Sequence, residues 1–480
     1  MSSRLANSRY GSIVERVKSE IQQKIWRPGE RVPSVREMSK AHGVSVMTVL
    51  KAYEYLESEG WIHAKAKTGY FVSPHFNRLP SPDVSIPQRV NRSININKHV
   101  FDVLRACKQP DVMPFGSAFP DPNLFPLQQL GRIFSQSCKG LPANSGLVDL
   151  PPGSLELRRV LAQRYLREGV PVSLDDIVIT SGAMESLGLS LAAVTQPGDT
   201  VLIESPVFYG ALQTIERLRL TAIELPTDPY SGVSIKELEA ALSDKSVKAC
   251  WLMSKFQNPL GASLSLTKKK AVYELLAKND VPLIEDDVYA ELYFGEEKPA
   301  PIKSLDDRGL ILHCSSFSKC LAPGFRVGWV AAGRYAKQIE ELQFMSTLSV
   351  GVPNQYALAQ YVQHGGYDNH LRQLRRTLKQ RLKQMRQAIV AVFPDGTQVT
   401  QPSGGYFLWV ELPNQRVDTS QVLSIVLQMH QISIAPGTLF SSDARYRHCL
   451  RINGSYAWSE KTEQALLVLA EFLRQQCLEQ

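Results

Sequence analysis

The chain has 480 residues, which is too many for one ordinary hydrophobic core, so two or more domains are expected. Hydrophobic residues make up 44% of the chain and charged residues 21%, the composition of a soluble globular protein. The formal net charge of +8 is only a weak indication of a nucleic-acid partner, because many basic enzymes bind none.

Nothing in the sequence indicates export or a membrane partner. The N-terminus is polar and charged, and the most apolar stretches, 177–193 and 465–473, are interrupted or too short to span a bilayer. The seven cysteines are scattered, with no CxxC motif and no metal-like pairing with histidine. We therefore expect a cytoplasmic protein with reduced thiols, no disulfide framework and no metal site.

The first predicted element is an amphipathic helix over residues 9–26, which Arg27-Pro28-Gly29 ends. Its apolar stripe consists of residues four apart: Ile13, Val17, Ile21 and Ile25. Ser34 is expected to cap a second helix over 35–41, with Glu37 completing a capping box.

Two further elements complete this N-terminal pattern. Ser45 is expected to cap a third helix over 46–59, which closes at Gly60. The segment WIHAKAKTGYFV, residues 61–72, alternates as a β-hairpin does, with a turn at Thr68-Gly69. Three helices followed by a basic hairpin is the order of a winged helix, and residues 1–75 form the first predicted domain.

The distribution of charge agrees with a DNA-reading role for this domain. Residues 1–75 hold 12 Lys and Arg against 7 Asp and Glu, whereas the remaining chain holds 42 against 39. Most of the excess therefore lies in the first sixth of the chain, as a small DNA-binding module requires. A solvated surface on a small helical domain is the alternative reading of these charges.

The segment from Trp26 to Val72, with its PGxRxPSxR turn, GVSxxTV helix start and AYxxLExEG helix end, resembles the GntR family of winged-helix repressors. With the preceding helix, the resemblance runs from residue 9 to 72, and it implies binding of double-stranded DNA. The expected contacts come from the recognition helix, the helix before it and the wing. The candidate residues are Arg36, Ser45, Met47, Thr48, Lys51, Lys65 and Lys67.

One position of the recognition helix departs from the GntR pattern. Many relatives carry Arg after the Val-Ser of this helix, and here that residue is Val46. A guanine contact from this position is therefore lost, or an apolar contact to a thymine methyl group replaces it.

Residues 76–110 are proline-rich at first and show little periodicity, so we expect a linker. From residue 111 to 480 short apolar runs, IVIT, TVLIE, KACWLM, VPLIEDD, LILHCSS and RVGWVAAG, alternate with amphipathic helical patterns. This alternation predicts an α/β domain with a largely parallel sheet and crossover helices. From about residue 351 long helices and two further strand-like segments predict a smaller α+β lobe.

Lys319 is the principal candidate for covalent chemistry in this second domain. An aldehyde cofactor needs an amine held in a dry pocket where its pKa falls. Lys319 follows a strand, lies among small polar residues that can bind phosphate, and precedes Gly324 and Arg326. The segment HCSSFSKCLAPGFRVGW resembles the SxSK…GxRxG signature of class I/II, fold-type I aminotransferases. The resemblance implies that Lys319 forms a Schiff base with pyridoxal 5′-phosphate (PLP), and that Ser316 and Arg326 bind its phosphate.

Further segments resemble the same family in the expected order. Gly182, Ala183 and Met184 of ITSGAMESL begin a helix directly after a strand, where free N–H groups and the helix dipole would hold an anion. By the resemblance, the remaining site residues bind the ring of PLP or the carboxylate of an effector. They are Phe208 on the pyridine face, Asn258 and Tyr289 at the phenolic oxygen, Asp286 at the pyridine nitrogen, and Arg451 at a substrate carboxylate.

Each of these motifs alone has a plainer reading. Phe208 alone is more typical of a core residue, the Asn258-Pro259 step of a turn, and Arg451 of a buried ion pair. Glu285-Asp286-Asp287 alone is a strand terminus or a set of metal ligands. Their joint order over about 270 residues is what favours a cofactor site.

Val148 marks a departure from the aminotransferase pattern. Many relatives have a Tyr there that reaches the phosphate of the neighbouring subunit, so this contact is missing or is made by another residue. A GntR reader joined to an aminotransferase-like domain, residues 111–480, resembles the MocR subfamily. This resemblance implies a homodimer that regulates transcription and senses an amino acid, an amine or a vitamin B6 compound through PLP.

Two other functions remain open at this stage. All the residues for PLP chemistry are present, so the protein could be a working aminotransferase with an appended DNA-binding domain. Alternatively, it could be a plain GntR repressor whose large domain binds a metabolite without a cofactor. The sequence names neither the operator nor the effector.

Overall fold

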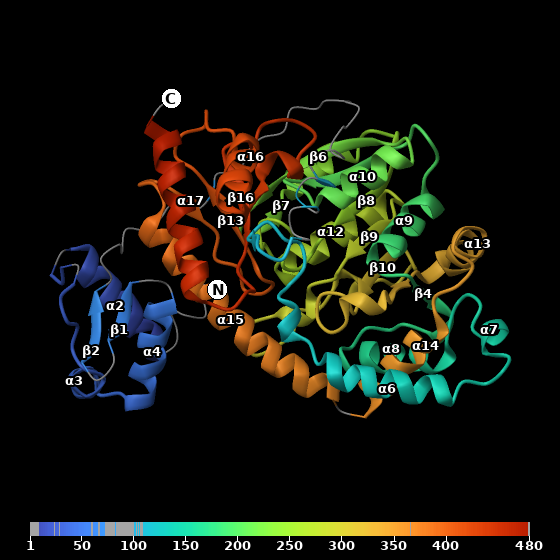
Figure 1. The fold of residues 1–480 in the computed structure, drawn as a ribbon, viewed down its shortest axis with the longest axis horizontal. Coiled ribbons are helices and arrows are strands. Elements are labelled where there is room, and N and C mark those ends of the chain that lie inside the picture. Colours follow the sequence, from blue (N-terminus) through green and yellow to red (C-terminus); the bar gives the residue numbers. More distant parts are fainter. Residues whose placement is uncertain are drawn as a thin grey trace. The chain divides into compact units, whose positions relative to one another are not determined.

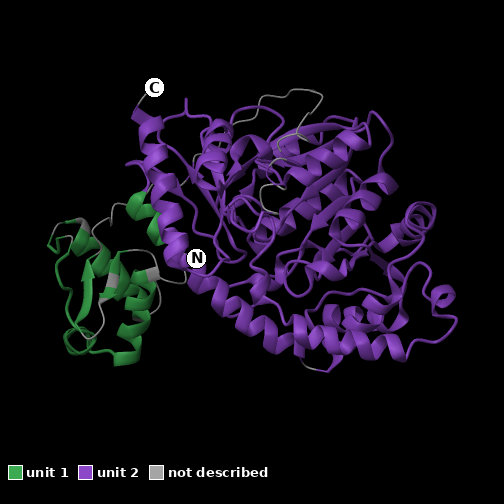
Figure 2. Ribbon diagram, in the orientation of Figure 1, with its two compact units in different colours: residues 1–80, 387–392 green, residues 81–386, 393–480 purple. Residues whose placement is uncertain are grey.

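The computed structural model describes residues 9–23, 25–27, 29–58, 61–65, 68–72, 82, 100–101, 103, 105, 109–364 and 366–478 (Figure 1). The chain divides into two compact units, residues 1–80 with 387–392, and residues 81–386 with 393–480 (Figure 2). Most of the predicted linker, 76–110, lies outside the described residues. Within the described part of the chain, no helix is both long and apolar enough to cross a bilayer.

The N-terminal unit is a winged helix. Its elements are α2 (Arg9–Gln22), α3 (Val35–His42), α4 (Val46–Ser58), β1 (Ile62–Lys65) and β2 (Gly69–Val72), the two strands pairing antiparallel. Ile13, Val17 and Ile21 of the predicted stripe are buried in its core, but Ile25 is 57% exposed. The prediction for Ile25 was wrong because α2 ends at Gln22, before this residue can join the stripe.

The caps read from the sequence form as expected. The Ser34 hydroxyl accepts a hydrogen bond from the Glu37 N–H, and the Glu37 carboxylate accepts one from the Ser34 N–H at 2.7 Å, which completes the capping box. Gly43 ends α3 in the left-handed conformation with φ 62°. The Thr48 N–H donates to the Ser45 hydroxyl at the start of α4. These local bonds fix the angle at which α3 and α4 meet.

The second unit is built on an eight-stranded sheet with the order β4-β11-β10-β9-β8-β5-β6-β7. All neighbouring strands from β10 to β6 are parallel, whereas β11 and the edge strand β7 run antiparallel to their neighbours. The six apolar runs picked out in the sequence all form strands. The strands are β4 (Ile177–Thr180), β5 (Thr200–Ser205), β6 (Thr221–Asp228), β7 (Gly232–Val233), β8 (Val247–Leu252), β9 (Leu283–Asp286), β10 (Ile311–Ser316) and β11 (Gly328–Ala331).

Helices pack around this sheet to form the large lobe (Figure 1). Helix α9 packs on β10 and β11, α8 on β4, and α11 on β6. The helices are α6 (Leu127–Lys139), α7 (Ser145–Val148), α8 (Leu155–Arg167), α9 (Ala183–Val194), α10 (Tyr209–Arg217), α11 (Ile235–Ala241), α12 (Leu266–Lys278), α13 (Ala336–Ser346) and α14 (Val352–Gln363). Short 3-10 turns lie at Pro122–Leu124, Leu174–Asp176, Ala290–Leu292, Ile302–Leu305, Pro323–Phe325, Gly333–Tyr335 and Gly437–Phe440.

The long helix α15 (Gly366–Val392) leads to the small lobe, the predicted α+β part. Its four-stranded sheet has the order β12-β13-β16-β15, and β14 pairs in parallel with β3 from the start of the unit. The elements are β3 (Met113–Pro114), β12 (Gln398–Val399), β13 (Phe407–Glu411), α16 (Thr419–His430), β14 (Ile432–Ser433), β15 (Ala435–Pro436), β16 (Cys449–Asn453) and α17 (Glu460–Leu478).

This topology places the predicted site residues at one edge of the large sheet. Strands β4, β5, β8, β9 and β10 all point the same way, because β11 is antiparallel to both β4 and β10. Gly182, Phe208, Asn258, Asp286 and Lys319 lie at or just after their carboxyl ends. Carboxyl ends of parallel strands are where α/β folds bind ligands.

Candidate functional site

Lys319 lies in the turn after β10, and its side chain is partly buried. Its Nζ donates to the Ala118 carbonyl at 2.8 Å and lies 4.6 Å from the centre of the Phe119 ring. Burial and the cations of Arg451 and Arg326 lower the pKa of Lys319 to about 7, although the Asp286 carboxylate opposes them. The amine is therefore largely neutral just above neutral pH, as a nucleophile for an aldehyde requires.

Asp286 ends β9 and has one side-chain oxygen without a partner. Its Oδ1 is buried and has no hydrogen-bond partner among the described residues. The carboxyl group receives hydrogen bonds from the Val288 backbone and the Trp251 side chain, yet burial and the nearby Asp287 raise its pKa to about 7. A buried carboxylate oxygen without a donor is costly unless a ligand supplies one. A protonated ring nitrogen of the PLP type fits this requirement.

Asn258, Tyr289 and Arg451 form a connected group although they come from three distant segments. Arg451 Nη1 donates to Asn258 Oδ1 at 2.9 Å, and the Asn258 Nδ2 donates to the Tyr289 hydroxyl at 3.4 Å. Arg451 Nη2 donates to the Gly116 carbonyl at 3.0 Å. The guanidinium carbon lies 4.0 Å from the centre of the Phe407 ring. The structure thus joins the predicted effector arginine to the two predicted partners of the phenolic oxygen.

A second group of donors forms a cradle at the start of α9. Arg326 Nη1 donates to the Ser318 hydroxyl at 3.1 Å, and Nη2 donates to the Ser181 carbonyl at 3.2 Å. The Ser318 N–H donates to the Ser316 hydroxyl at 3.4 Å. Ala183 and Met184 begin the helix, where N–H groups and the positive end of the dipole favour an anion.

Gly182 is required by the geometry of this cradle. It adopts φ +103°, a conformation that side chains disfavour. A Cβ atom there would also lie 2.5 Å from Arg326 Nη2. Glycine is also needed at position 328 of β11, because a Cβ atom there would lie 2.6 Å from the Gly182 carbonyl carbon. Glycine at both positions lets Arg326 lie against the start of the helix.

Phe208 precedes α10, and its ring centre lies 4.7 Å from that of Tyr209. A Cβ atom on Gly210 would meet both Phe208 and the Met184 sulfur, so these two side chains adjoin one another at the cradle. Val148, at the end of α7, is 66% exposed, so the described residues of the chain leave this position largely uncovered.

Sequence reasoning missed several residues of the site. Ser318 and Ser181 bond to Arg326, and Trp251 bonds to Asp286. The hydroxyl-rich segment SSFSK was the only signal for Ser318. Nothing in the local sequence indicates Trp251 or the carbonyl of Ala118, because both are brought to the pocket from distant strands and loops.

A buried ionic network lies next to Asp286. Lys255 Nζ lies 2.6 Å from Asp287 Oδ2, and His313 Nε2 lies 2.8 Å from the same oxygen. Tyr165 extends the network with a 2.7 Å hydrogen bond to His313 Nδ1. Burial alone would raise the pKa of Asp287, but Lys255 and His313 hold it well below its usual range. Asp287 is therefore a fixed negative charge beside Asp286.

The candidate DNA contacts lie on the winged helix. Arg36 and Lys51 are exposed, and Met47 is 69% exposed at the first turn of α4. Ser45 and Thr48 hydrogen-bond to each other at 2.8 Å. Side chains at the start of a recognition helix are those that reach base edges.

The wing and Val46, the position that departs from the GntR pattern, are the remaining candidates for DNA contact. Val46 is 48% exposed beside Met47, so two apolar side chains begin the recognition helix. Lys65 ends β1, but its side chain and the whole of Lys67 lie outside the described residues.

Comparisons with known proteins agree with both halves of this description. Residues 9–72 match the bacterial regulatory proteins of the gntR family, and residues 148–467 match aminotransferase class I and II. The chain is 48% identical to the HTH-type transcriptional regulator YdcR of Escherichia coli (strain K12), over 97% of this chain and 99% of the relative. It is 38% identical to YjiR of the same organism, over 97% and 98%.

The chain belongs to the MocR subfamily of GntR transcriptional regulators. A kynurenine aminotransferase from Pyrococcus horikoshii, solved in complex with PMP, has 29% identity and a TM-score of 0.71, covering 78% of this chain and 94% of that one. This MocR-type regulator therefore combines a DNA-binding winged helix with a fold-type I aminotransferase domain. The fold class and the regulatory role predicted from the sequence are confirmed.

The lowered pKa of Lys319 gives a testable pH dependence. In the cofactor-free chain we expect labelling of Lys319 by a small amine-reactive reagent to rise through a midpoint near pH 7 rather than near the usual 10.5. Arg451→Met removes a cation and should raise this midpoint, whereas Asp286→Asn removes an anion and should lower it. Mass spectrometry of labelled peptides measures the profile, with the exposed Lys236 as reference. A Lys319 midpoint near 10.5 would contradict the burial of the amine.

Proposed function

We propose that this regulator holds PLP through Lys319 and uses it to sense an amino acid, and that binding of the amino acid changes how its winged helices hold DNA. The unpaired, buried Oδ1 of Asp286 beside the depressed pKa of Lys319 is the observation that carries the proposal. PLP supplies an aldehyde that reacts reversibly with amines and a pyridine ring that withdraws electrons.

Each group of the site would then have one task. The cradle of Ser316, Arg326 and the first turn of α9, with Gly182, Ala183 and Met184, would hold the phosphate. Asp286 would keep the ring nitrogen protonated, and Asn258 and Tyr289 would bind the phenolic oxygen. Phe208 would cover a face of the ring. Lys319 would hold the cofactor until an amine displaces it.

Arg451 favours an effector with a carboxylate. The guanidinium is buried and packs on Phe407, and two of its nitrogens already donate to oxygens, those of Asn258 and Gly116. A carboxylate can accept two parallel hydrogen bonds from such a group. An amino acid offers both this carboxylate and the amine for the aldehyde, so it matches the site better than a simple amine.

A homodimer would complete the site. Large apolar side chains are exposed on α7, on α9, on α13 and just after α13: Leu147, Val148, Met184, Phe344, Met345 and Leu348. The Thr347 hydroxyl bonds to Glu185, so the end of α13 adjoins the start of α9. Exposed apolar patches of this kind mark protein interfaces. A second copy of the chain would cover Val148, and one of its residues would contact the phosphate of PLP in place of the missing Tyr.

Coupling to DNA would run through the segment between the two domains. We assign residues 1–75 to the reader, 76–110 to a linker and 111–480 to the effector domain. An effector shifts the DNA-bound state only by its differential affinity for two arrangements of the dimer. A linker of roughly 35 residues is long enough to let one chain's reader rest on the other chain. A DNA target of this kind would require the protein to act in the cytoplasm.

The decisive experiment combines reductive trapping with footprinting. Borohydride reduction of the chain with PLP should leave a pyridoxyl adduct on Lys319, and Lys319→Ala should abolish it while Lys236→Ala keeps it. Footprints on the DNA upstream of its own gene should change when PLP and amino acids are added. Unchanged footprints despite an adduct would refute sensing, and absence of the adduct would favour a plain GntR repressor. Sustained transamination at ordinary enzyme rates would instead favour a working aminotransferase, since Lys319, Asp286 and Arg451 are all in place.

Gly182 offers a test of the phosphate cradle. Gly182→Ala should weaken PLP binding at least about ten-fold, because its Cβ would displace Arg326 and strain the backbone. Gly131→Ala is the matched control, since a Cβ atom there meets nothing within 4 Å. Titration of the cofactor absorbance gives both affinities. Equal affinities in the two variants would exclude the cradle as the phosphate site.

The exposed Met47 and Val46 predict a preference for thymine. Replacing the contacted thymines of the operator by uracil removes one methyl group each, which should weaken binding by about 0.8 kcal/mol or roughly four-fold per contact. Met47→Ala should reduce this sensitivity. Lys51→Ala should weaken binding to both DNAs equally, because a phosphate contact carries no sequence information. Fluorescence anisotropy measures the six affinities of the three proteins for the two DNAs, and equal binding of thymine and uracil DNA by the wild type would disprove the contact.

A further inference from the structure

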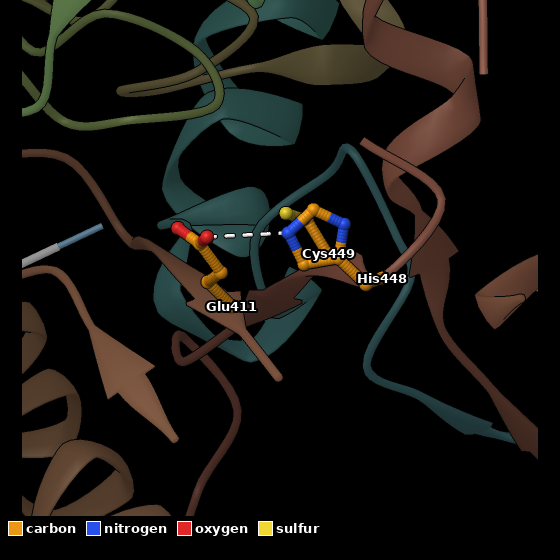
Figure 3. A group of neighbouring side chains, drawn as sticks. All are labelled: Glu411, His448 and Cys449. Carbon is orange, nitrogen blue, oxygen red and sulfur yellow. Dashed lines mark hydrogen bonds and ion pairs between the residues drawn. The ribbon is translucent and has the colours of Figure 1, made fainter. Parts of the chain in front are cut away.

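A second group of reactive side chains lies in the small lobe, outside the site described above. Glu411 ends β13, and His448 and Cys449 stand at the start of β16. One ligand atom from each lies within 4.8 Å of the others. Figure 3 shows the Glu411 carboxylate facing the His448 ring, at 3.2 Å from Nε2, with the Cys449 sulfur beside them. We call these three residues the Glu–His–Cys cluster.

The sheet itself holds two of the three ligands in place. Glu411 and Cys449 are direct partners in the antiparallel pairing of β13 and β16. Directly opposite residues point to the same face with Cβ atoms about 5 Å apart, a separation that one metal ion can bridge. His448 is only 8% exposed and Cys449 1%, so water competes little for these ligands. The arrangement therefore exists without any rearrangement of the backbone.

A cavity of about 220 Å³ adjoins the cluster. Pro206, Thr227 and Leu260 of the large lobe line one side, and the Glu–His–Cys cluster with Trp409 and Tyr446 of the small lobe lines the other. A water molecule needs about 30 Å³, so the cavity has room for an ion and its remaining ligands.

A fourth oxygen lies in the same row of the sheet. Gln398 of β12 is the direct partner of Glu411 on the opposite side from Cys449. The Gln398 side-chain oxygen is buried and finds no hydrogen-bond partner within the described part of the chain. Gln398, Glu411 and Cys449 therefore form one row across three strands, and the row ends in an acceptor that lacks a donor.

The chemistry of these ligands selects the ion. A thiolate, an imidazole and a carboxylate are the ligands that Zn²⁺ prefers, whereas Ca²⁺ and Mg²⁺ require oxygen alone. One carboxylate and one thiolate also balance the two charges of Zn²⁺. Arg445, which lines the same cavity, has its own carboxylate partner in Asp443 at 2.6 Å. An ion pair between Glu411 and His448 beside a core thiol is the alternative, but it leaves the Gln398 oxygen unexplained.

We propose that Glu411, His448 and Cys449 bind Zn²⁺, with the Gln398 side chain or a water molecule as the fourth ligand. On binding, the Cys449 thiol loses its proton to solvent as the sulfur–zinc bond forms. The scattered cysteines of the sequence gave no indication of such a site, because Glu411 is 37 residues away from His448 along the chain. This proposal does not depend on the binding of PLP.

The proposed zinc site lies on the same pair of strands as Arg451, the predicted effector-binding residue. Trp409 pairs with Arg451, and two residues further along the same strands Glu411 pairs with Cys449. Residues two apart share a face of a strand, so Glu411, Cys449 and the predicted effector arginine lie on one face of the small-lobe sheet. Since the cavity has walls from both lobes, a bound ion would hold this part of the small lobe near the large one.

The test uses the full untagged chain after removal of metal with a chelator. Titration calorimetry should show one equivalent of Zn²⁺ binding per chain, and Co²⁺ should produce a thiolate-to-metal charge-transfer band in the near ultraviolet. Cys449→Ser should abolish the band and weaken Zn²⁺ binding at least about ten-fold, and His448→Gln and Glu411→Gln should weaken it similarly.

Matched controls make the result specific to the cluster. Cys138→Ser removes an exposed thiol and His364→Gln an exposed imidazole elsewhere, and both should bind as the wild type does. Circular dichroism shows whether each variant is folded. The proposal would be overturned if the wild type bound Zn²⁺ no more tightly than folded Glu411→Gln does. It would also be overturned if the Co²⁺ charge-transfer band persisted in Cys449→Ser.

Discussion

An amine and a carboxyl group share one desolvated pocket in this protein, and burial moves the pKa of each to about 7. Near pH 7 neither Lys319 nor Asp286 strongly prefers its charged form, because neither side chain is fully solvated or fully paired. A ligand that offers an aldehyde to one and a ring N–H to the other would relieve both costs at once. Strands β9 and β10 are parallel neighbours in the eight-stranded sheet, and this pairing brings their carboxyl ends together.

The three consecutive acids Glu285, Asp286 and Asp287 show how position determines the role of a carboxylate. Glu285 accepts hydrogen bonds from the backbone N–H groups of Ile302 and Lys303, so it fixes a turn. Asp287 is bound by Lys255 and His313 and stays ionised. Asp286, between them, makes no such ion pair within the described residues, and its Oδ1 lacks a donor, as does Asp287 Oδ1. Neighbours from distant parts of the chain decide these roles, which is why the sequence alone left a strand terminus or a metal set open.

Local signals in the sequence predicted much of the fold. The capping box of Ser34 and Glu37 and the apolar runs of the large sheet depend on residues close together in the chain, and they were found. The prediction failed for Ile25, where the periodicity continued past the end of the helix. The motif order also indicated Lys319, Asp286 and Arg451, and the structure brings them into one electrostatic environment. Non-local contacts, such as Trp251 to Asp286 or Glu411 to Cys449, have no local signature and could not be predicted.

Arg451 already makes hydrogen bonds within the protein itself. Its guanidinium already donates to the Asn258 side chain and to the Gly116 carbonyl, so an incoming carboxylate has to compete with oxygens that the protein supplies itself. Such competition would lower the affinity for a carboxylate effector, so that a higher concentration would be needed to occupy the site. If the chain senses an amino acid as proposed, the strength of these two internal hydrogen bonds would set the concentration at which the amino acid is detected.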